Sequence, residues 1–244
     1  MSAARLADRR LIGVVLGALT LTVLTGCVET TQTKSARIEV QDNRLLASEE
    51  PVRVARADGE VSVLGVALVH GAGGRVAVAV RLRNDAARSL TDLPISVGVR
   101  APDGRITLLN AQANLPYFQT HIGAVAPGSQ TTWVFTGRSG APAGTPVALV
   151  GAPTFTVAAA PATLPQITTA PATPGRVTIT NRSGIPQYAL TVYASAEAAG
   201  RVLAAGQAAV AELAPGARAT VAVPLVGDAG TSSLQLDAPP TLLR

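Results

Sequence analysis

The chain has 244 residues, a formal net charge of +5 and only 14% charged residues. Its basic residues are scattered, without runs or interleaved aromatic residues, which argues against a nucleic-acid-binding protein. With one cysteine, two histidines and one methionine, the chain has few metal ligands and cannot form an internal disulfide. We therefore expect no metal site and no cofactor.

The first part of the chain has the features of an export signal. Arg5, Arg9 and Arg10 form a basic start, and residues 11–24 form an uncharged apolar stretch. This stretch is shorter than the roughly 20 residues that a membrane-spanning helix needs, and its length is typical of a signal peptide.

The motif LTGC at residues 24–27 resembles the lipobox of bacterial lipoproteins. The resemblance implies that residues 1–26 are a signal peptide and that Cys27 carries a diacylglycerol with acyl chains such as palmitate. It places the protein outside the cytoplasm, anchored by lipid to the outer face of the cell membrane, or to an outer membrane if the organism has one. A free thiol after an ordinary signal peptide and an uncleaved anchor helix are the alternatives.

The lipidated cysteine opens a polar segment, residues 27–56, that we predict to be a flexible tether. Treated as a random coil, a segment of this length has an average reach of roughly 30 Å. Residues 37–40 have the pattern of a short strand. The alternative is that the segment packs as an extra edge strand on the domain that follows.

From Glu60 onward the sequence has the pattern of successive strands. Residues 61–69 are apolar on both faces, and residues 76–82 alternate valine or leucine with small or charged residues. Such period-two patterns, bounded by glycine, proline, asparagine and aspartate, predict strands. Residues 194–211 are rich in alanine, but Gly200 and Gly206 interrupt them, so we expect no helix there.

Several landmarks occur twice in the same order, which indicates an internal duplication. Asn84 matches Asn181, and the turn APG at 126–128 matches APG at 214–216. Trp133 and Phe135 match valines in the second copy. We predict an all-β chain with two tandem immunoglobulin-like β-sandwich modules of about seven strands each. Their ranges are residues 57–158 and 163–244, with a linker rich in proline, alanine and threonine at 159–174 that overlaps a candidate first strand at 164–168.

The second module carries the motifs GRVTITN at 175–181, LTVYA at 190–194 and LAPG at 213–216. These motifs resemble the FxLYD-type and related immunoglobulin-like domains of exported bacterial lipoproteins. Tyr193 has the place of the tyrosine in that family, whereas Tyr188 and Ala194 replace its phenylalanine and aspartate. The match covers about 50 residues, and the resemblance gives no catalytic residues.

The sequence has no recognisable catalytic constellation, and we expect no enzyme. The run HGAGG at 70–74 is similar to the glycine-rich oxyanion loop of esterases, but the chain lacks the matching nucleophile motif GxSxG. We predict a glycine hairpin instead. The acidic residues are dispersed, Asn84 and Asn181 are predicted to shape turns, and Trp133 is predicted to lie in the core.

The two modules differ most at residues 112–123, where the first module has extra residues. This segment brings Tyr117, Phe118, Gln119 and His121 into a chain with few aromatic residues. Because binding residues favour loops on rigid scaffolds, we predict a recognition surface here. The alternative is that Tyr117 and Phe118 fold back over their own core. Tyr193 is a further candidate, either exposed or packed at a contact between the modules.

The leading functional hypothesis is a non-enzymatic adaptor or assembly protein of the cell envelope, with another envelope protein as its partner. The runner-up is binding of cell-wall glycan or a small ligand through residues 112–123.

Overall fold

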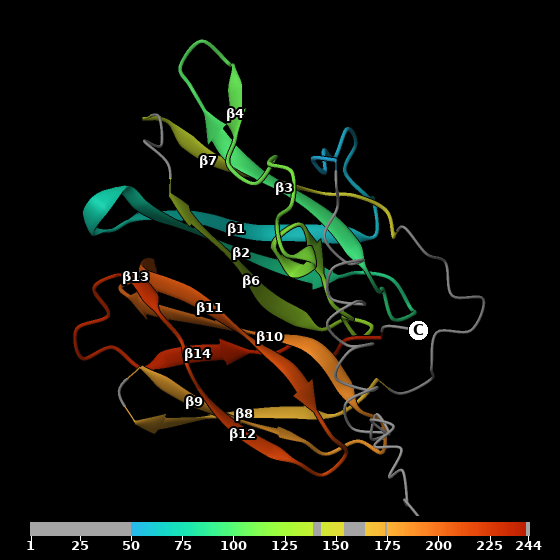
Figure 1. The fold of residues 1–244 in the computed structure, drawn as a ribbon. Coiled ribbons are helices and arrows are strands. Elements are labelled where there is room, and N and C mark those ends of the chain that lie inside the picture. The colour runs from blue at the N-terminus through green and yellow to red at the C-terminus, as the bar shows by residue number, and fades with distance from the viewer. Residues whose placement is uncertain (1–49, 139–142, 154–163, 174, 243–244) are drawn as a thin grey trace, which may run out of the picture. The chain divides into compact units, whose positions relative to one another are not determined.

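The computed structural model describes residues 50–138, 143–153, 164–173 and 175–242. These residues form antiparallel strands joined by turns and two 3-10 helices, and the prediction of an all-β sandwich is confirmed (Figure 1). The lipobox, Cys27 and the candidate strand at 37–40 lie outside the described residues. Within the described ranges, no helix is long and apolar enough to cross a bilayer.

We call residues 61–150 the first half of the structure. Its strands are β1 (Val61–His70), β2 (Arg75–Asn84), β3 (Leu93–Arg100), β4 (Ile106–Leu108), β5 (His121–Ile122), β6 (Gln130–Arg138) and β7 (Thr145–Val150). One sheet has the order β1-β2-β6, and in the other β3 pairs with β4, β5 and β7. The 3-10 helices are η1 (Ala72–Gly74) and η2 (Tyr117–Gln119).

We call residues 167–237 the second half. Its strands are β8 (Ile167–Thr173), β9 (Arg176–Asn181), β10 (Gln187–Ala198), β11 (Arg201–Leu213), β12 (Arg218–Ala222), β13 (Leu225–Gly227) and β14 (Leu234–Asp237). They form one sheet with the order β12-β9-β8 and another with the order β13-β11-β10-β14. As predicted, the alanine-rich run forms no helix. It makes the two longest strands, which turn at Ala199 and Gly200, both with positive φ.

The period-two pattern of β2 builds the core of the first half. Val78 and Val80 are fully buried and lie opposite Phe135 and Trp133 in the register of β2 and β6. Trp133 has 0% and Phe135 2% of its surface exposed, which confirms the predicted core role of Trp133.

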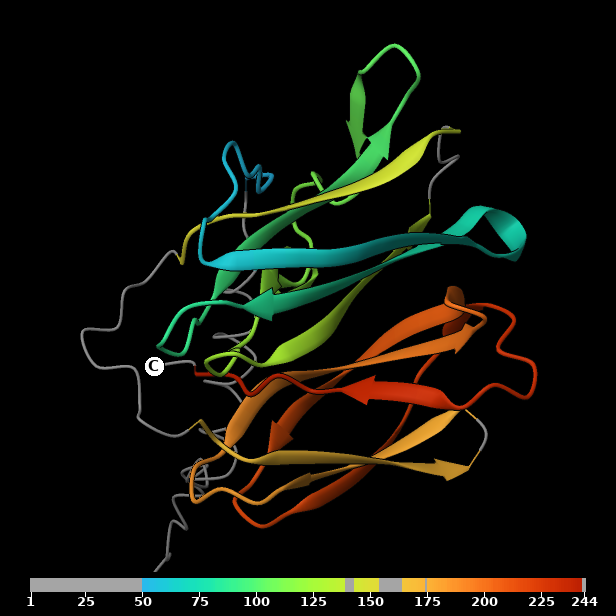
Figure 2. The same cartoon turned by 180° about the vertical axis from the view of Figure 1, so that it is seen from behind.

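The sheet β13-β11-β10-β14 is buried on both of its faces. On one face, Leu190 and Val192 pack with Val177 in the core of the second half. On the other face, Tyr193 and Ala205 pack in the same apolar cluster as the core of the first half. Figures 1 and 2 show β10 and β11 beside β6 in both views. The two halves are therefore joined by a buried contact between sheets.

At least three hydrogen bonds reinforce this contact. The backbone N–H of Thr132 donates to Oδ2 of Asp237 over 3.2 Å, and the amide of Gln207 donates to the hydroxyl of Thr136 over 3.4 Å. In the third, the N–H of Ala124 donates to the carbonyl of Pro240. Burial raises the pKa of the Asp237 carboxyl above its ordinary value, although its bonds to Thr132 oppose this effect.

Asn84 and Asn181, the matched asparagines, make two corresponding hydrogen bonds each. Each is fully buried and ends the second strand of its half. The Asn84 amide donates to the carbonyls of Arg88 and Val125 over 2.8 and 2.9 Å. The Asn181 amide donates to the carbonyls of Ile185, Leu213 and Ala214 over 2.8, 3.0 and 3.2 Å. The duplication stays a prediction, and these matched bonds favour it.

Two predicted boundaries differ from the described structure. Val54 lies in the predicted tether, yet its N–H donates to the hydroxyl of Ser96 on β3 over 2.8 Å, so the end of that segment is held on the sandwich. The predicted linker at 159–174 contains β8, which continues to Thr173, beyond the candidate strand at 164–168. Pro171 concealed the second part of this strand, because an edge strand tolerates proline where a central strand does not.

We predict that Asn84→Ala lowers the free energy of unfolding by about 2–3 kcal/mol, because it leaves buried carbonyls without their donor. Asn181→Ala should have a similar effect. Urea denaturation of each variant measures the change. The exposed amide variant Gln112→Ala should stay within about 0.5 kcal/mol of the parent protein. Equal stability of all three variants would contradict a structural role for the asparagines.

Candidate functional site

The segment at residues 112–123 begins just after a buried asparagine. Asn110 follows β4 and is fully buried. Its side-chain oxygen accepts from the N–H of Val97, and its amide donates to the carbonyls of Ile95 and Gln119 over 2.8 and 3.1 Å. These bonds tie the last residue of η2 to β3 through Asn110. Sequence reasoning missed Asn110, because a single asparagine after a short apolar run has no distinctive pattern.

The backbone of Phe118 is held by both halves of the structure. Its carbonyl accepts from Nε1 of Trp133 over 2.9 Å and from the hydroxyl of Tyr193 over 3.3 Å. The side chain of Phe118 is buried, with 7% exposed, and Tyr193 is buried at the contact between the halves. Phe118 therefore lies over its own core, as the alternative interpretation proposed, and is not available on the surface.

Tyr117 and His121 form the centre of the candidate site. Their rings are stacked, with centroids 4.0 Å apart and planes 1° apart. The hydroxyl of Tyr117 donates to Oδ1 of Asp92, and Nδ1 of His121 lies 3.0 Å from the hydroxyl of Thr120. Asp92 has a positive φ of 58°, a conformation that is uncommon outside glycine. The surrounding contacts thus hold Asp92 in an unfavourable backbone conformation, and this conformation is part of the cluster.

Burial sets the protonation of both rings in the stack. It raises the pKa of the Tyr117 phenol, and the carboxylate of Asp92 raises this pKa further. Burial lowers the pKa of His121, against an opposing effect of Asp92. Near neutral pH the stack therefore consists of a neutral phenol and a neutral imidazole. This arrangement suits a rigid contact surface better than proton transfer.

The predicted site residues are thus divided between surface and interior. Tyr117 and Gln119 are half-exposed, whereas Phe118, His121 and Tyr193 are buried. The structure brings Tyr117, Phe118, Gln119 and His121 together around η2, and it brings Tyr193 to the same segment from the second half.

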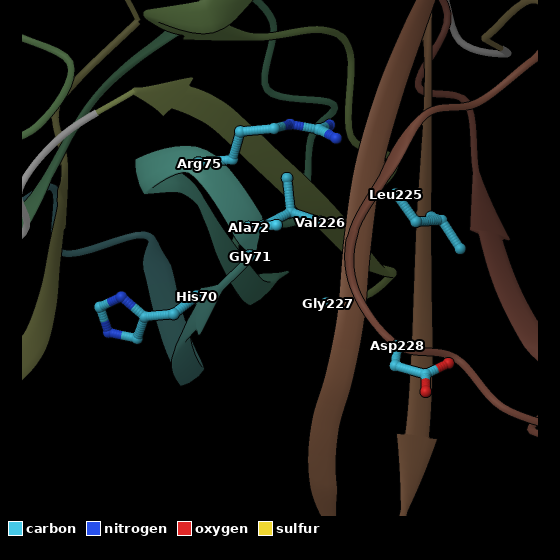
Figure 3. Close-up of a pocket in the computed structure, with 8 residues that line it drawn as sticks. All are labelled: His70, Gly71, Ala72, Arg75, Leu225, Val226, Gly227 and Asp228. Atoms are coloured by element: carbon cyan, nitrogen blue, oxygen red, sulfur yellow. The ribbon is translucent and has the colours of Figure 1, made fainter.

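A separate open hollow of about 390 Å³ lies between the β1–β2 turn and β13 (Figure 3). The turn is the predicted glycine hairpin, in which Gly73 and Gly74 have positive φ. The imidazole of His70, the guanidinium of Arg75 and the carboxylate of Asp228 point in different directions in Figure 3 and do not converge. Among the described residues, no group of three or more histidine, cysteine or acidic side chains is placed to hold a metal ion.

No protein-family model matches the chain, and no curated protein is similar to it in sequence. The resemblances to the lipobox and to FxLYD-type domains therefore remain predictions from the residues quoted above.

We predict that acid lowers the stability of the protein through His121. Its pKa is lower in the folded state than the unfolded value of about 6.5, so the unfolded chain binds more protons in this range. The contribution of neutral His121 to stability is complete above the unfolded value of about 6.5. It is lost as the pH falls towards the pKa of His121 in the folded state.

Urea denaturation between pH 7.5 and pH 5.5 measures this loss, above the range in which ordinary carboxyls titrate. His121→Gln should flatten the dependence, whereas His70→Gln, which changes an exposed imidazole, should leave it unchanged. A slope that depends on His70 rather than His121 would contradict the assignment.

Proposed function

We propose that the protein is an exported lipoprotein that acts as a non-enzymatic adaptor or assembly protein of the cell envelope. The observation that carries this proposal is the fixed segment at residues 117–121, which presents the half-exposed Tyr117 on a rigid base. Tyrosine is enriched in protein interfaces, and a surface held in place before binding loses less conformational entropy when the partner docks.

The proposed location rests on Cys27 and the leader before it. A diacylglycerol on this cysteine would contribute about 0.8 kcal/mol per buried CH₂, and two acyl chains are enough for stable anchoring. The tether before residue 50 would then join the anchor to the β-sandwich. The proposed partners are the membrane, through the lipid, and an envelope protein, through the surface at Tyr117.

The anchor is tested by Cys27→Ser. We expect the parent chain to be cut before Cys27, to carry the mass of a diacylglycerol, and to enter the detergent phase of a phase-separation assay. The variant should lack this mass and lose the cleavage. Intact-mass analysis of both proteins measures this, and a parent chain with an unmodified thiol would overturn the proposed location.

The adaptor role is tested by a photo-crosslinker at Gln119, which is half-exposed beside Tyr117. In native membranes it should give a discrete adduct with one envelope protein, whereas a crosslinker at the exposed Gln235 on β14 should not. Tyr117→Ala should remove the adduct while lowering stability by about 1 kcal/mol, the scale of one hydrogen bond or ring contact.

Phe118→Ala provides the internal comparison, because its ring is buried. We expect it to lower the free energy of unfolding by about 3 kcal/mol. If Tyr117→Ala leaves the adduct intact, the proposed contact surface is wrong.

Binding of cell-wall glycan or a small ligand is the second candidate function. The stacked pair of Tyr117 and His121 favours it, because one half-exposed aromatic ring on a rigid base is a suitable platform for a sugar ring. Under this hypothesis, Tyr117→Ala would abolish binding of the purified protein to cell-wall material, and the crosslinker at Gln119 would capture no protein.

A further inference from the structure

The outer face of the sheet β12-β9-β8 is uncovered in the described structure. Val177 and Ile179 on β9 are fully buried against the core, so the residues that alternate with them point outward. The strand register places the matching residues of β8 and β12 on the same face. These outward residues are Thr168, Ala170, Arg176, Thr178, Thr180, Arg218, Thr220 and Ala222.

This face is positively charged and has no acidic residues of its own. Arg176 and Arg218 project from it and are exposed, and Arg182 lies at its end, where Nε is 3.4 Å from the hydroxyl of Thr168. The chain contains no aspartate or glutamate at residues 164–186 or 214–227. Within the described ranges, none of these three arginines forms a salt bridge, whereas Arg81, Arg83 and Arg88 of the first half all do.

The corresponding face of the first half is covered, unlike the outer face of β12-β9-β8. There the sheet β1-β2-β6 turns Ala77 and Ala79 towards the second half, and both alanines are buried. Counted back from the matched asparagines, Ala79 corresponds to Arg176. A second sheet packed on this arginine would bury a cation without a carboxylate partner, which is strongly unfavourable. The outer face of β12-β9-β8 therefore does not suit pairing with the same face of another copy of this chain.

The arginines are spread along the outer face. Arg218 lies opposite Thr180, which is four residues along β9 from Arg176. At roughly 3.4 Å per residue, the two arginine backbones are about 14 Å apart along the strand. The Arg176 side chain reaches over β12, where its Nη2 is 3.4 Å from the carbonyl of Thr220. With Arg182 at the end of the face, the three cations form a broad surface that suits several headgroups in a plane. The threonine hydroxyls between the arginines, such as the Thr178–Thr220 pair at 3.1 Å, add further hydrogen-bonding groups.

We infer that this face is a contact surface for the anionic phospholipid headgroups of a bilayer. The inference rests on the proposed anchor at Cys27, which would confine the sandwich close to the membrane. Charge complementarity then favours docking of the second half. The surface at Tyr117 belongs to a different part of the fold and is not used by this contact.

The test uses the full lipidated chain in vesicles, with a fluorescent label at Ala222→Cys on the outer face. Headgroup quenchers in the bilayer report docking of the label. Vesicles of phosphatidylcholine with 30% phosphatidylglycerol should quench the label strongly, and vesicles of pure phosphatidylcholine should not. Added salt should reverse the quenching, because exposed charges are screened.

The decisive variant combines Arg176→Gln, Arg182→Gln and Arg218→Gln. It should lower the docking constant by roughly a hundredfold, or about fivefold per arginine, from the usual contribution of a basic side chain at an anionic membrane. The matched control combines Arg100→Gln, Arg105→Gln and Arg201→Gln, which removes the same charge from other exposed positions. The control should change docking less than threefold.

Three outcomes would overturn the inference. Quenching could be independent of phosphatidylglycerol, or the two triple variants could weaken it equally, which would indicate net charge alone. The arginine face could instead bind soluble inorganic polyphosphate while ignoring vesicles, which would indicate a soluble polyanion as the partner. A failed anchor is recognised separately, because a free Cys27 would itself take up the label.

Discussion

The described structure depends on one sheet that is packed on both sides. The sheet β13-β11-β10-β14 serves the core of the second half with one face and contacts the first half with the other. Alanine makes this arrangement possible, because small side chains let neighbouring sheets approach closely. Ala194, Ala196, Ala204 and Ala205 are all buried with 1% exposure or less. Without this sheet, neither the joint between the halves nor the segment around η2 would have its present form.

Tyr193 is the large side chain on the face of β10 that contacts the first half. Its ring lies near Trp133, with centroids 6.4 Å apart, and its hydroxyl shares the carbonyl of Phe118 with the indole N–H. One backbone oxygen thus receives a donor from each half. The joint between the halves and the shape of the candidate surface at Tyr117 are consequently linked by a single acceptor. We regard this link as the reason why the loop of the first half that carries the proposed docking point is rigid.

Much of the fold could be predicted because strand periodicity and turn chemistry are local properties. The alternation in β2 predicts its buried valines, and the glycines at residues 70–74 predict the first hairpin. The matched asparagines were recognised as turn residues. Their hydrogen bonds to Val125 and Leu213, which are distant in the sequence, were not predicted. Asn110 and the inward direction of Phe118 were not predictable in this way. Both depend on which distant backbone groups lie nearby, and sequence spacing carries little information about that.

Pro171 on β8 has a consequence for a chain held at a surface. Proteins confined to two dimensions meet at far higher local concentrations than in solution, and exposed edge strands then become templates for pairing between molecules. β8 forms the edge of its sheet, and Pro171 lacks a backbone donor, while the register shifts between Pro171 and Thr173. In the proposed membrane-bound form, this proline and the irregular register beside it would disfavour edge-to-edge pairing of neighbouring molecules.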